Sequence, residues 1–131
     1  MKEYEIQIEI EKSCLLNCVH CSSYEMRKSG KRYFTDEAIV DFLSCFQGNI
    51  RVYFTGGDPI LYPNLIRLCK LISTRKANAS IGLYTSGNCA MMKPISEAFA
   101  SLLAHAGVKE GYFSIYHSIP EEHDAFTGQS G

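Results

Sequence analysis

Three cysteines lie within eight residues of this sequence, in the segment CLLNCVHC at positions 14 to 21. Three residues separate Cys14 from Cys18, and two separate Cys18 from Cys21. Core packing explains three thiols in one short segment poorly, so the spacing favours a metal site. A cube of four irons normally takes one thiolate per iron, so three thiolates leave one iron without a protein ligand. Such an open iron is a place where a reaction can occur.

Zinc is the alternative metal. Structural zinc prefers four protein ligands, usually as two separated pairs, and the sequence has no second C-x-x-C pair. His20 is a candidate fourth ligand, but its direct neighbour Cys21 makes shared coordination of one ion awkward. The remaining cysteines have other expected places. Cys45 and Cys69 fall on apolar faces of predicted helices and are expected in the core, whereas Cys89 is expected to be exposed.

Four short strands are expected to position this segment. In the first, Tyr4, Ile6, Ile8 and Ile10 alternate with polar residues, which is the period of a strand with one buried face. The other three are apolar runs that stop at turn residues. The second strand ends in residues 52–54, before Gly56 and Gly57. The third covers residues 81–84, and the fourth covers residues 112–116.

Helical periodicity fills the intervals between the predicted strands. Asp36 favours a helix start, Pro63 and Pro94 fit the first turns of the next two helices, and Gly107 fits a helix end. Three sets of residues are each expected to share a helix face: Ile39, Phe42, Leu43 and Phe46; Leu65, Leu68, Cys69 and Ile72; and Ile95, Ala98, Phe99, Leu102 and Leu103.

Alternating strands and helices predict an α/β fold of parallel strands with right-handed crossovers, either an open sheet or part of a barrel. Ligands collect at the carboxyl ends of such strands. This edge would hold the cysteine segment, the GGDP turn at residues 56–59, the TSG turn at 85–87 and the YHS segment at 116–118.

The bulk composition limits the partners. The chain has 131 residues, of which 46% are hydrophobic, and a net charge of -1, so we expect one domain over residues 1–131. No run of basic residues indicates a nucleic-acid partner, and no apolar stretch indicates a signal peptide or a membrane span. The predicted location is therefore the cytoplasm.

The cysteine segment resembles the C-x3-C-x2-C signature of the radical S-adenosylmethionine (SAM) enzymes. Three further segments strengthen the resemblance: FTGGDPILYP at residues 54–63, YTSGN at 84–88 and YFSIYHSIPEEHDAFTG at 112–128. The last resembles the SPASM-associated, peptide-modifying members. The resemblance implies a partial (βα) barrel, of which this chain carries the first four strand-helix units, and we expect the core to continue beyond residue 131.

The resemblance also implies site residues. Cys14, Cys18 and Cys21 would hold a [4Fe-4S] cluster, whose open iron binds SAM. His20 would lie beside the adenine. The GGDP turn, Gly56 to Pro59, would contact the methionine ammonium, with Asp58 where the family usually has Glu. Ser86 and Ser114 would contact the ribose or methionine part, and the later His123, Asp124, Thr127 and Gly128 would organise a loop.

The implied reaction is reductive cleavage of SAM to a 5'-deoxyadenosyl radical, which takes hydrogen from a substrate. The implied partners are a flavodoxin-like or ferredoxin-like electron donor and a substrate, with a peptide or protein favoured over a small molecule. One alternative is a non-catalytic iron-sulfur or zinc module for electron transfer or binding. Another is self-association of the chain through the open edge of the fourth strand.

Overall fold

The computed structural model describes residues 2–28, 34–89 and 93–130 of the chain. Strands and helices alternate along most of it, as expected. In chain order the elements are β1 (Glu3–Glu11), α1 (Tyr24–Lys28), α2 (Asp36–Ser44), β2 (Asn49–Gly56), the 3-10 helix η1 (Pro59–Leu61), α3 (Leu65–Arg75), β3 (Ala79–Thr85), β4 (Asn88–Cys89), β5 (Lys93–Pro94), α4 (Glu97–His105), β6 (Val108–Phe113) and α5 (Pro120–Thr127).

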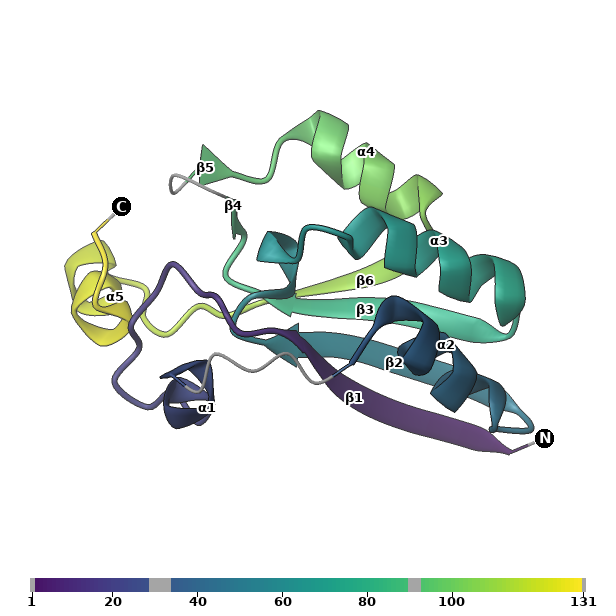
Figure 1. Ribbon diagram of the computed structural model, residues 1–131. Coiled ribbons are helices and arrows are strands. Elements are labelled where there is room, and N and C mark those ends of the chain that lie inside the picture. Colours follow the sequence, from purple (N-terminus) through teal and green to yellow (C-terminus); the bar gives the residue numbers. More distant parts are fainter. Residues whose placement is uncertain (1, 29–33, 90–92, 131) are drawn as a thin grey trace.

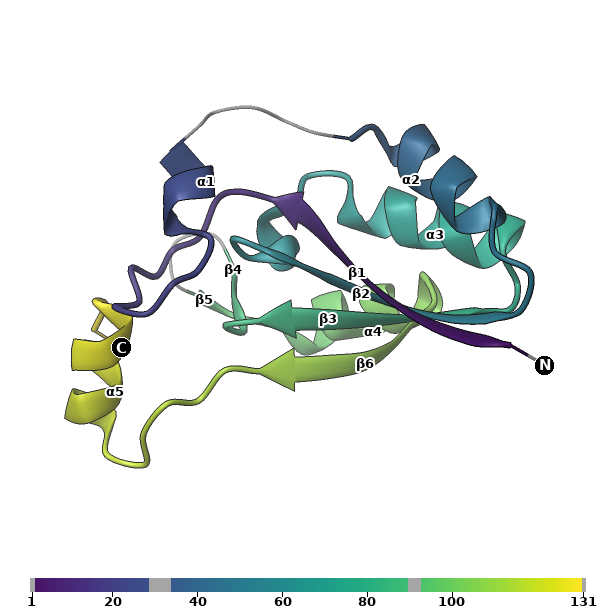
Figure 2. The same cartoon turned by 90° about the horizontal axis from the view of Figure 1, so that it is seen from below.

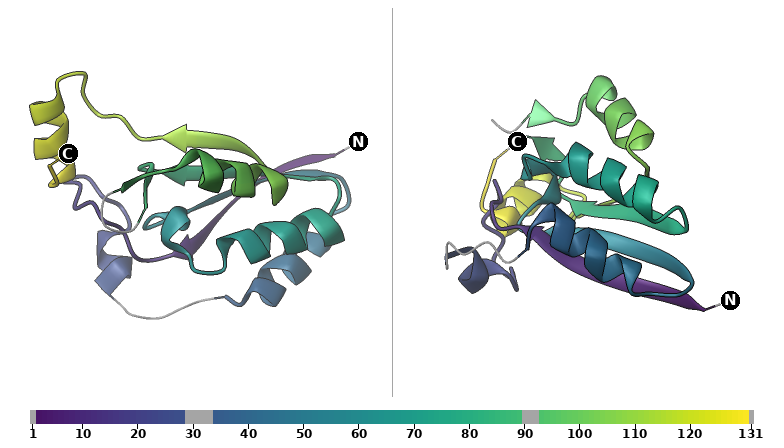
Figure 3. Two further views of the ribbon diagram at one scale, coloured as in Figure 1. Left: turned by 90° about the horizontal axis from the view of Figure 1, so that it is seen from above. Right: turned by 45° about the vertical axis from the view of Figure 1, so that its right-hand side comes forward.

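The main sheet has the strand order β1-β2-β3-β6, and each neighbouring pair is parallel (Figure 1). The crossovers α2, α3 and α4 lie together on one face of this sheet (Figure 3). Because all four strands run the same way, their carboxyl ends form one edge. The α/β prediction with parallel strands is confirmed, and the short β4-β5 hairpin is an addition that no sequence pattern indicated.

The core lies between the sheet and the three crossover helices. Ile8 and Ile10 of β1 point into it, as the alternating pattern predicted. Phe54 of β2, Leu68 of α3 and Ile81 of β3 are completely buried there. Apolar burial on this one face explains why strand and helix periods are both clear in the sequence.

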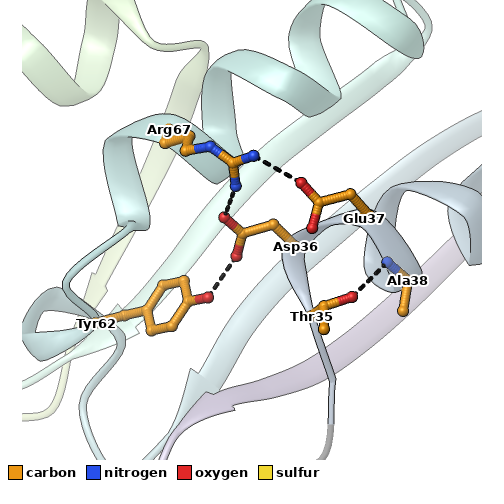
Figure 4. Close-up of polar contacts among 6 residues, drawn as sticks. All are labelled: Thr35, Asp36, Glu37, Ala38, Tyr62 and Arg67. Carbon is orange, nitrogen blue, oxygen red and sulfur yellow. Dashed lines mark hydrogen bonds and ion pairs between the residues drawn. The ribbon is translucent and has the colours of Figure 1, made fainter.

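Helix α2 is fixed at its amino end by side chains from two other segments (Figure 4). Thr35 caps the helix, its hydroxyl oxygen accepting from the backbone N of Ala38 at 3.1 Å. The buried carboxylate of Asp36 accepts hydrogen bonds from the hydroxyl of Tyr62 and the guanidinium of Arg67 (Figure 4). These bonds hold the start of α2 against the segment between η1 and α3.

Three details of the sequence prediction are wrong. Helix α4 begins at Glu97 after the cap Ser96, because the side chain of Ser96 accepts from the backbone N of Phe99, and Pro94 lies in β5 instead. The fourth strand runs from Val108 to Phe113, earlier than residues 112–116. Three residues expected on buried helix faces are exposed: Phe42 at 49%, Leu102 at 52%, and Ala98.

Chain segments remote in sequence meet at the carboxyl edge of the sheet. The cysteine segment and α1, which follow β1, lie at the same end of the molecule as α5, near the end of the described chain (Figures 1 and 2). Two backbone hydrogen bonds join them: the N of Asn17 donates to the O of Thr127 at 2.8 Å, and the N of Val19 donates to the O of Phe126 at 3.1 Å. Helix α5 therefore packs against one side of the cysteine segment.

Candidate functional site

The three cysteines of the 14–21 segment line one cavity of about 320 Å³ at the carboxyl edge of the sheet. All three thiols are free and half-buried. The backbone N of Cys21 donates to the O of Cys18 at 3.2 Å and closes a turn. This turn keeps the second and third cysteines close together in space. The spacing therefore brings three thiols to one wall of a cavity, as predicted.

Among the described residues, no three His, Cys, Asp or Glu side chains are placed to hold a single metal ion. An iron-sulfur cube does not require such convergence, because each cysteine binds a different iron. Three free thiols facing a common cavity are the donor set that this kind of cluster takes. Cys14, Cys18 and Cys21 are therefore the residues that could hold it.

Burial changes the acidity of these thiols. It raises the pKa of Cys14, and it raises the pKa of Cys18, where the neighbouring thiols of Cys14 and Cys21 act in the same direction. The metal-free thiols of Cys14 and Cys18 are therefore neutral at pH 7, and a bound metal would have to displace their protons.

The GGDP turn forms the support beneath the cysteine segment. The backbone N of Gly57 donates to the O of Glu11 at 2.6 Å, and the N of Asp58 donates to the O of Ser13 at 2.7 Å. A Cβ on Gly57 would collide with the carbonyl oxygens of Lys12 and Ser13, so only glycine allows this approach. The turn thus fixes the stem from which the cysteines project.

Asp58 lies at the centre of the polar contacts of the site. Its carboxylate is 2% exposed and accepts four hydrogen bonds within the protein. Oδ1 accepts from Thr85 Oγ1 at 2.6 Å and Ile60 N at 3.2 Å, and Oδ2 accepts from Ser86 N at 2.9 Å and Ser86 Oγ at 2.7 Å. Asp58 joins the ends of β2 and β3. Its expected contact with a SAM ammonium stays a prediction.

Most of the other predicted site residues line the same cavity. The cavity wall includes His20, Gly56, Gly57, Asp58, Ser86 and Ser114. Pro59 is not part of it, because this residue is buried as the first residue of η1. The structure therefore brings together all but one of the residues predicted from sequence.

The ring of His20 is part of an aromatic group formed with the segment after β6. It contacts Tyr116 at 4.8 Å and Phe126 at 4.7 Å between ring centroids, and these two rings are 4.5 Å apart. His123, on α5, accepts from the backbone N of Tyr116 through Nδ1 at 3.2 Å. The final segment therefore orders the cysteine loop, and its His123 contributes a backbone contact.

Arg27 on α1 is a site residue that the sequence did not reveal. Its Nη1 lies 3.7 Å from Cys21 Sγ, and its Nη2 donates to the O of Leu16 at 3.2 Å. The positive charge therefore lies beside the thiols. Its position six residues after Cys21 belongs to no motif, although a basic residue near clustered thiols was a usable signal.

Two further cavity residues could have been found from strand alternation. Glu9 is the last polar residue before the final apolar position of the β1 pattern, and its Oε1 accepts from Ser23 Oγ at 3.2 Å. Tyr84 occupies the polar-side position next to the end of β3. Side chains at these alternate strand positions lie on the face of the sheet away from the helices. This open face therefore continues into the cavity.

The other cysteines lie outside the site. Cys69 is fully buried in the core, as predicted. Cys45 is exposed, as is Phe42 one turn earlier, so this side of α2 faces away from the core and the core prediction for Cys45 is wrong. Cys89 is half-buried and packs against the core, so its expected exposure is also wrong.

A larger hollow of about 640 Å³ lies between β1 and α2. Its described lining is mostly apolar, with Ile6, Ile8 and Phe42 among the residues, and includes no thiol or imidazole. The smaller cavity holds the chemical groups and is therefore the candidate site. None of the helices in the described part of the chain is long and apolar enough to cross a membrane.

Comparison with known proteins bears on this site. The family model of the Radical SAM superfamily matches residues 8–128. The chain is 34% identical over 84 residues to the PqqA peptide cyclase of Bradyrhizobium diazoefficiens, covering 62% of this chain and 20% of that protein. It is 28% identical over 86 residues to the GTP 3',8-cyclase of Pseudomonas fluorescens, covering 63% of this chain and 26% of that protein.

An uncharacterized protein of Methanocaldococcus jannaschii is 25% identical over 105 residues, covering 79% of this chain and 36% of that protein. The crystal structure of BtrN in complex with AdoMet and 2-DOIA shares the fold, with a TM-score of 0.67 and 18% identity over 97% of this chain and 51% of that chain. The chain thus spans about half of that structure and 36% or less of these curated relatives. By its sequence match over almost its whole length, the chain belongs to the Radical SAM superfamily.

Proposed function

We propose that this chain forms the cofactor-binding part of a radical SAM enzyme. One observation carries the proposal: the three half-buried thiols line the same cavity as Gly56, Gly57 and Asp58 of the GGDP turn. Cys14, Cys18 and Cys21 would hold a [4Fe-4S] cluster and leave one iron for SAM. When bound, cluster and SAM supply the one-electron chemistry, in which SAM is cleaved reductively and hydrogen is taken from a substrate.

The protein's own part is to bind, orient and exclude water. Gly56 and Gly57 bring backbone groups to the cavity wall, where they can face the methionine end of SAM. Ser86, fixed by Asp58, and Ser114 supply hydroxyls to the same cavity. His20 presents its ring for contact with the adenine.

A peptide substrate and a small electron-transfer protein complete the proposal. The resemblance of residues 112–128 to peptide-modifying members supports the first, as does the similarity to a peptide cyclase. A flavodoxin-like or ferredoxin-like donor would supply the electron to the cluster. The cysteine loop lies at one end of the molecule (Figure 1), and its Val19 is 74% exposed, which leaves the loop reachable by such a donor.

Anaerobic reconstitution with iron and sulfide tests this proposal. The reconstituted chain, reduced with dithionite, is expected to release 5'-deoxyadenosine from SAM. Cys18→Ala should abolish the release, whereas Cys45→Ala, which changes an exposed cysteine outside the cavity, should retain it. A bound cluster without SAM cleavage would instead support the non-catalytic iron-sulfur module, and zinc in place of iron would overturn both.

A further inference from the structure

One face of the main sheet is left open by the helices. Helices α2, α3 and α4 lie on the other face, and Figure 2 shows β3 and β6 passing in front of α4. The strand register places one row of side chains across the open face: Gln7, Tyr53, Gly82 and Glu110 are successive partners. Tyr84 and Tyr112 are partners in the row nearer the cavity.

Three tyrosines pack together on this face, where Tyr84 and Tyr112 are 36% and 43% exposed and Tyr53, at 5%, is buried beside them. The rings of Tyr84 and Tyr112 stack, with centroids 5.0 Å apart. Tyr53 lies 5.6 Å from Tyr84 and 5.8 Å from Tyr112. A Cβ on Gly82 would meet the Tyr53 ring, so this glycine lets the ring cross β3 toward β6.

The carboxylate of Glu110 is held at the border of this aromatic surface. Its Oε2 accepts from the hydroxyl of Tyr112 at 2.8 Å and from that of Tyr53 at 3.4 Å. Within the described part of the chain, no hydrogen bond is made to Oε1. The hydrogen bond to Glu110 also raises the pKa of Tyr112, so the phenol remains a donor at neutral pH. One oxygen is thus fixed by the protein, and the other is left without a donor among the described residues.

The charges on this face favour a cation. Glu5, Glu9 and Glu110 belong to it, and Arg51, the register partner of Glu5, is the basic residue among these positions. Aromatic faces attract cations through their quadrupoles. A carboxylate beside the two exposed rings of Tyr84 and Tyr112 therefore matches a protonated amine or guanidinium better than a neutral or anionic group.

The remaining oxygen of Glu110 favours an ammonium over a guanidinium. A guanidinium binds a carboxylate best through two parallel bonds, which require both oxygens. Both tyrosine hydroxyls already occupy Oε2, so a single ammonium donor fits what remains. The stem of a lysine side chain can lie along apolar rings while its head reaches a polar group.

The aromatic surface leads directly to the cavity of the three cysteines. Tyr84 lines that cavity and stacks on Tyr112. Glu110 precedes Tyr112 by two residues on β6, which is about 7 Å along a strand. A lysine with its ammonium at Glu110 would therefore have its backbone directed toward the cavity.

We propose that the open face binds a lysine side chain of a peptide substrate, with the stem on Tyr84 and Tyr112 and the ammonium at Glu110. This inference rests on the proposed function, because it names the substrate class of the same site. Its test is a binding measurement that needs neither cluster nor SAM. Failure of lysine binding would leave SAM cleavage untouched, and failure of cluster assembly would leave the binding measurement intact.

The probe is the capped peptide Ac-Gly-Gly-Lys-Gly-Gly-NH2, titrated into the purified chain and followed by amide NMR shifts of Tyr84, Glu110 and Tyr112. Versions with norleucine or arginine in place of lysine, and free lysine, are titrated in parallel. We expect the lysine peptide to bind most tightly. Equal binding of the norleucine peptide, tighter binding of the arginine peptide, equal binding of free lysine, or no shift with any probe would overturn the proposal.

Two variants locate the contact. Glu110→Gln keeps the size of the side chain and is expected to weaken lysine-peptide binding about 10-fold, the effect of losing one charged hydrogen bond. The matched control, Glu97→Gln on α4, should leave binding unchanged because α4 lies on the other face. Tyr112→Phe frees one position on Oε2 and should reduce the preference for lysine over arginine. Unchanged affinity in Glu110→Gln or unchanged preference in Tyr112→Phe would contradict the assignment.

Discussion

The carboxylate of Asp58 accepts two hydrogen bonds from Ser86, one from its backbone N at 2.9 Å and one from its hydroxyl at 2.7 Å. This pair joins the end of β2 to the turn after β3 beside the cysteine cavity. Asp58 is buried, so the bonds are protected from competing water. The position of Ser86 in the site therefore depends on Asp58.

Asp58→Ala is expected to lower the free energy of unfolding by about 2 to 4 kcal/mol, because buried donors of Thr85 and Ser86 lose a charged acceptor. Ser86→Ala should cost less, since its backbone bond remains. The double variant should show a coupling of about 1 kcal/mol in chemical denaturation. Asp41→Ala, at an exposed position of α2, is the matched control; an equal loss there would contradict the account.

Arg27→Ala is expected to weaken retention of the cluster, because it removes the positive charge beside Cys21. Groups that support metal ligands in this way typically change affinity about 10-fold. The measurement is the rate of iron loss to a chelator from the reconstituted chain. Lys28→Ala, on the same helix but paired with exposed Glu25, should behave as the unmodified chain. Equal iron loss from both variants would show that Arg27 has no special role.

Phe126→Ala is expected to loosen the contact between α5 and the cysteine loop, at a cost of about 1 to 2 kcal/mol for a half-buried ring. Hydrogen exchange should then become faster at the amides of Asn17 and Val19, which donate to this segment. Ile119→Ala changes an exposed apolar residue next to α5 and should leave both amides protected. Unchanged exchange in Phe126→Ala would mean that other contacts order the loop.

Much of the fold was readable from the sequence, because burial on one side of the sheet gives the chain clear periods. The alternation of Ile8 and Ile10 with polar residues, and the helix face of Leu68 and Ile72, both correspond to the core. The method failed at element ends. The apolar run at residues 112–116 predicted too late a fourth strand, since β6 ends at Phe113. Cys45 was expected in the core, but it lies one turn after the exposed Phe42 and is itself exposed.

The site was readable where chemistry is local in sequence. The cysteine spacing and the GGDP turn are short segments, and both lie in the cavity. Contacts between distant segments were not readable, because they depend on strand register. Examples are Gly57 against Ser13 and Phe126 against His20. Arg27 was missed for the same reason, since only the fold of α1 brings it to Cys21.

Thiol reactivity separates the cysteines. Burial raises the pKa of Cys69 to about 12, and its side chain is inaccessible, so it should resist alkylation by iodoacetamide at pH 8. Cys45 is exposed and should react first. Reconstitution with iron and sulfide should protect Cys14, Cys18 and Cys21 but not Cys45, as read by mass spectrometry of peptides. In denaturant all six should react, and rapid native labelling of Cys69 would refute its burial.

The central claim is that three cysteines hold a cluster with one iron open to SAM. The most direct measurement is the electron paramagnetic resonance spectrum of the reconstituted, dithionite-reduced chain with and without SAM. We predict about four irons per chain and a spectrum that changes when SAM is added, because SAM would bind the open iron. A reduced cluster whose spectrum is the same at saturating SAM, or a chain that takes up zinc and no iron, would contradict the claim.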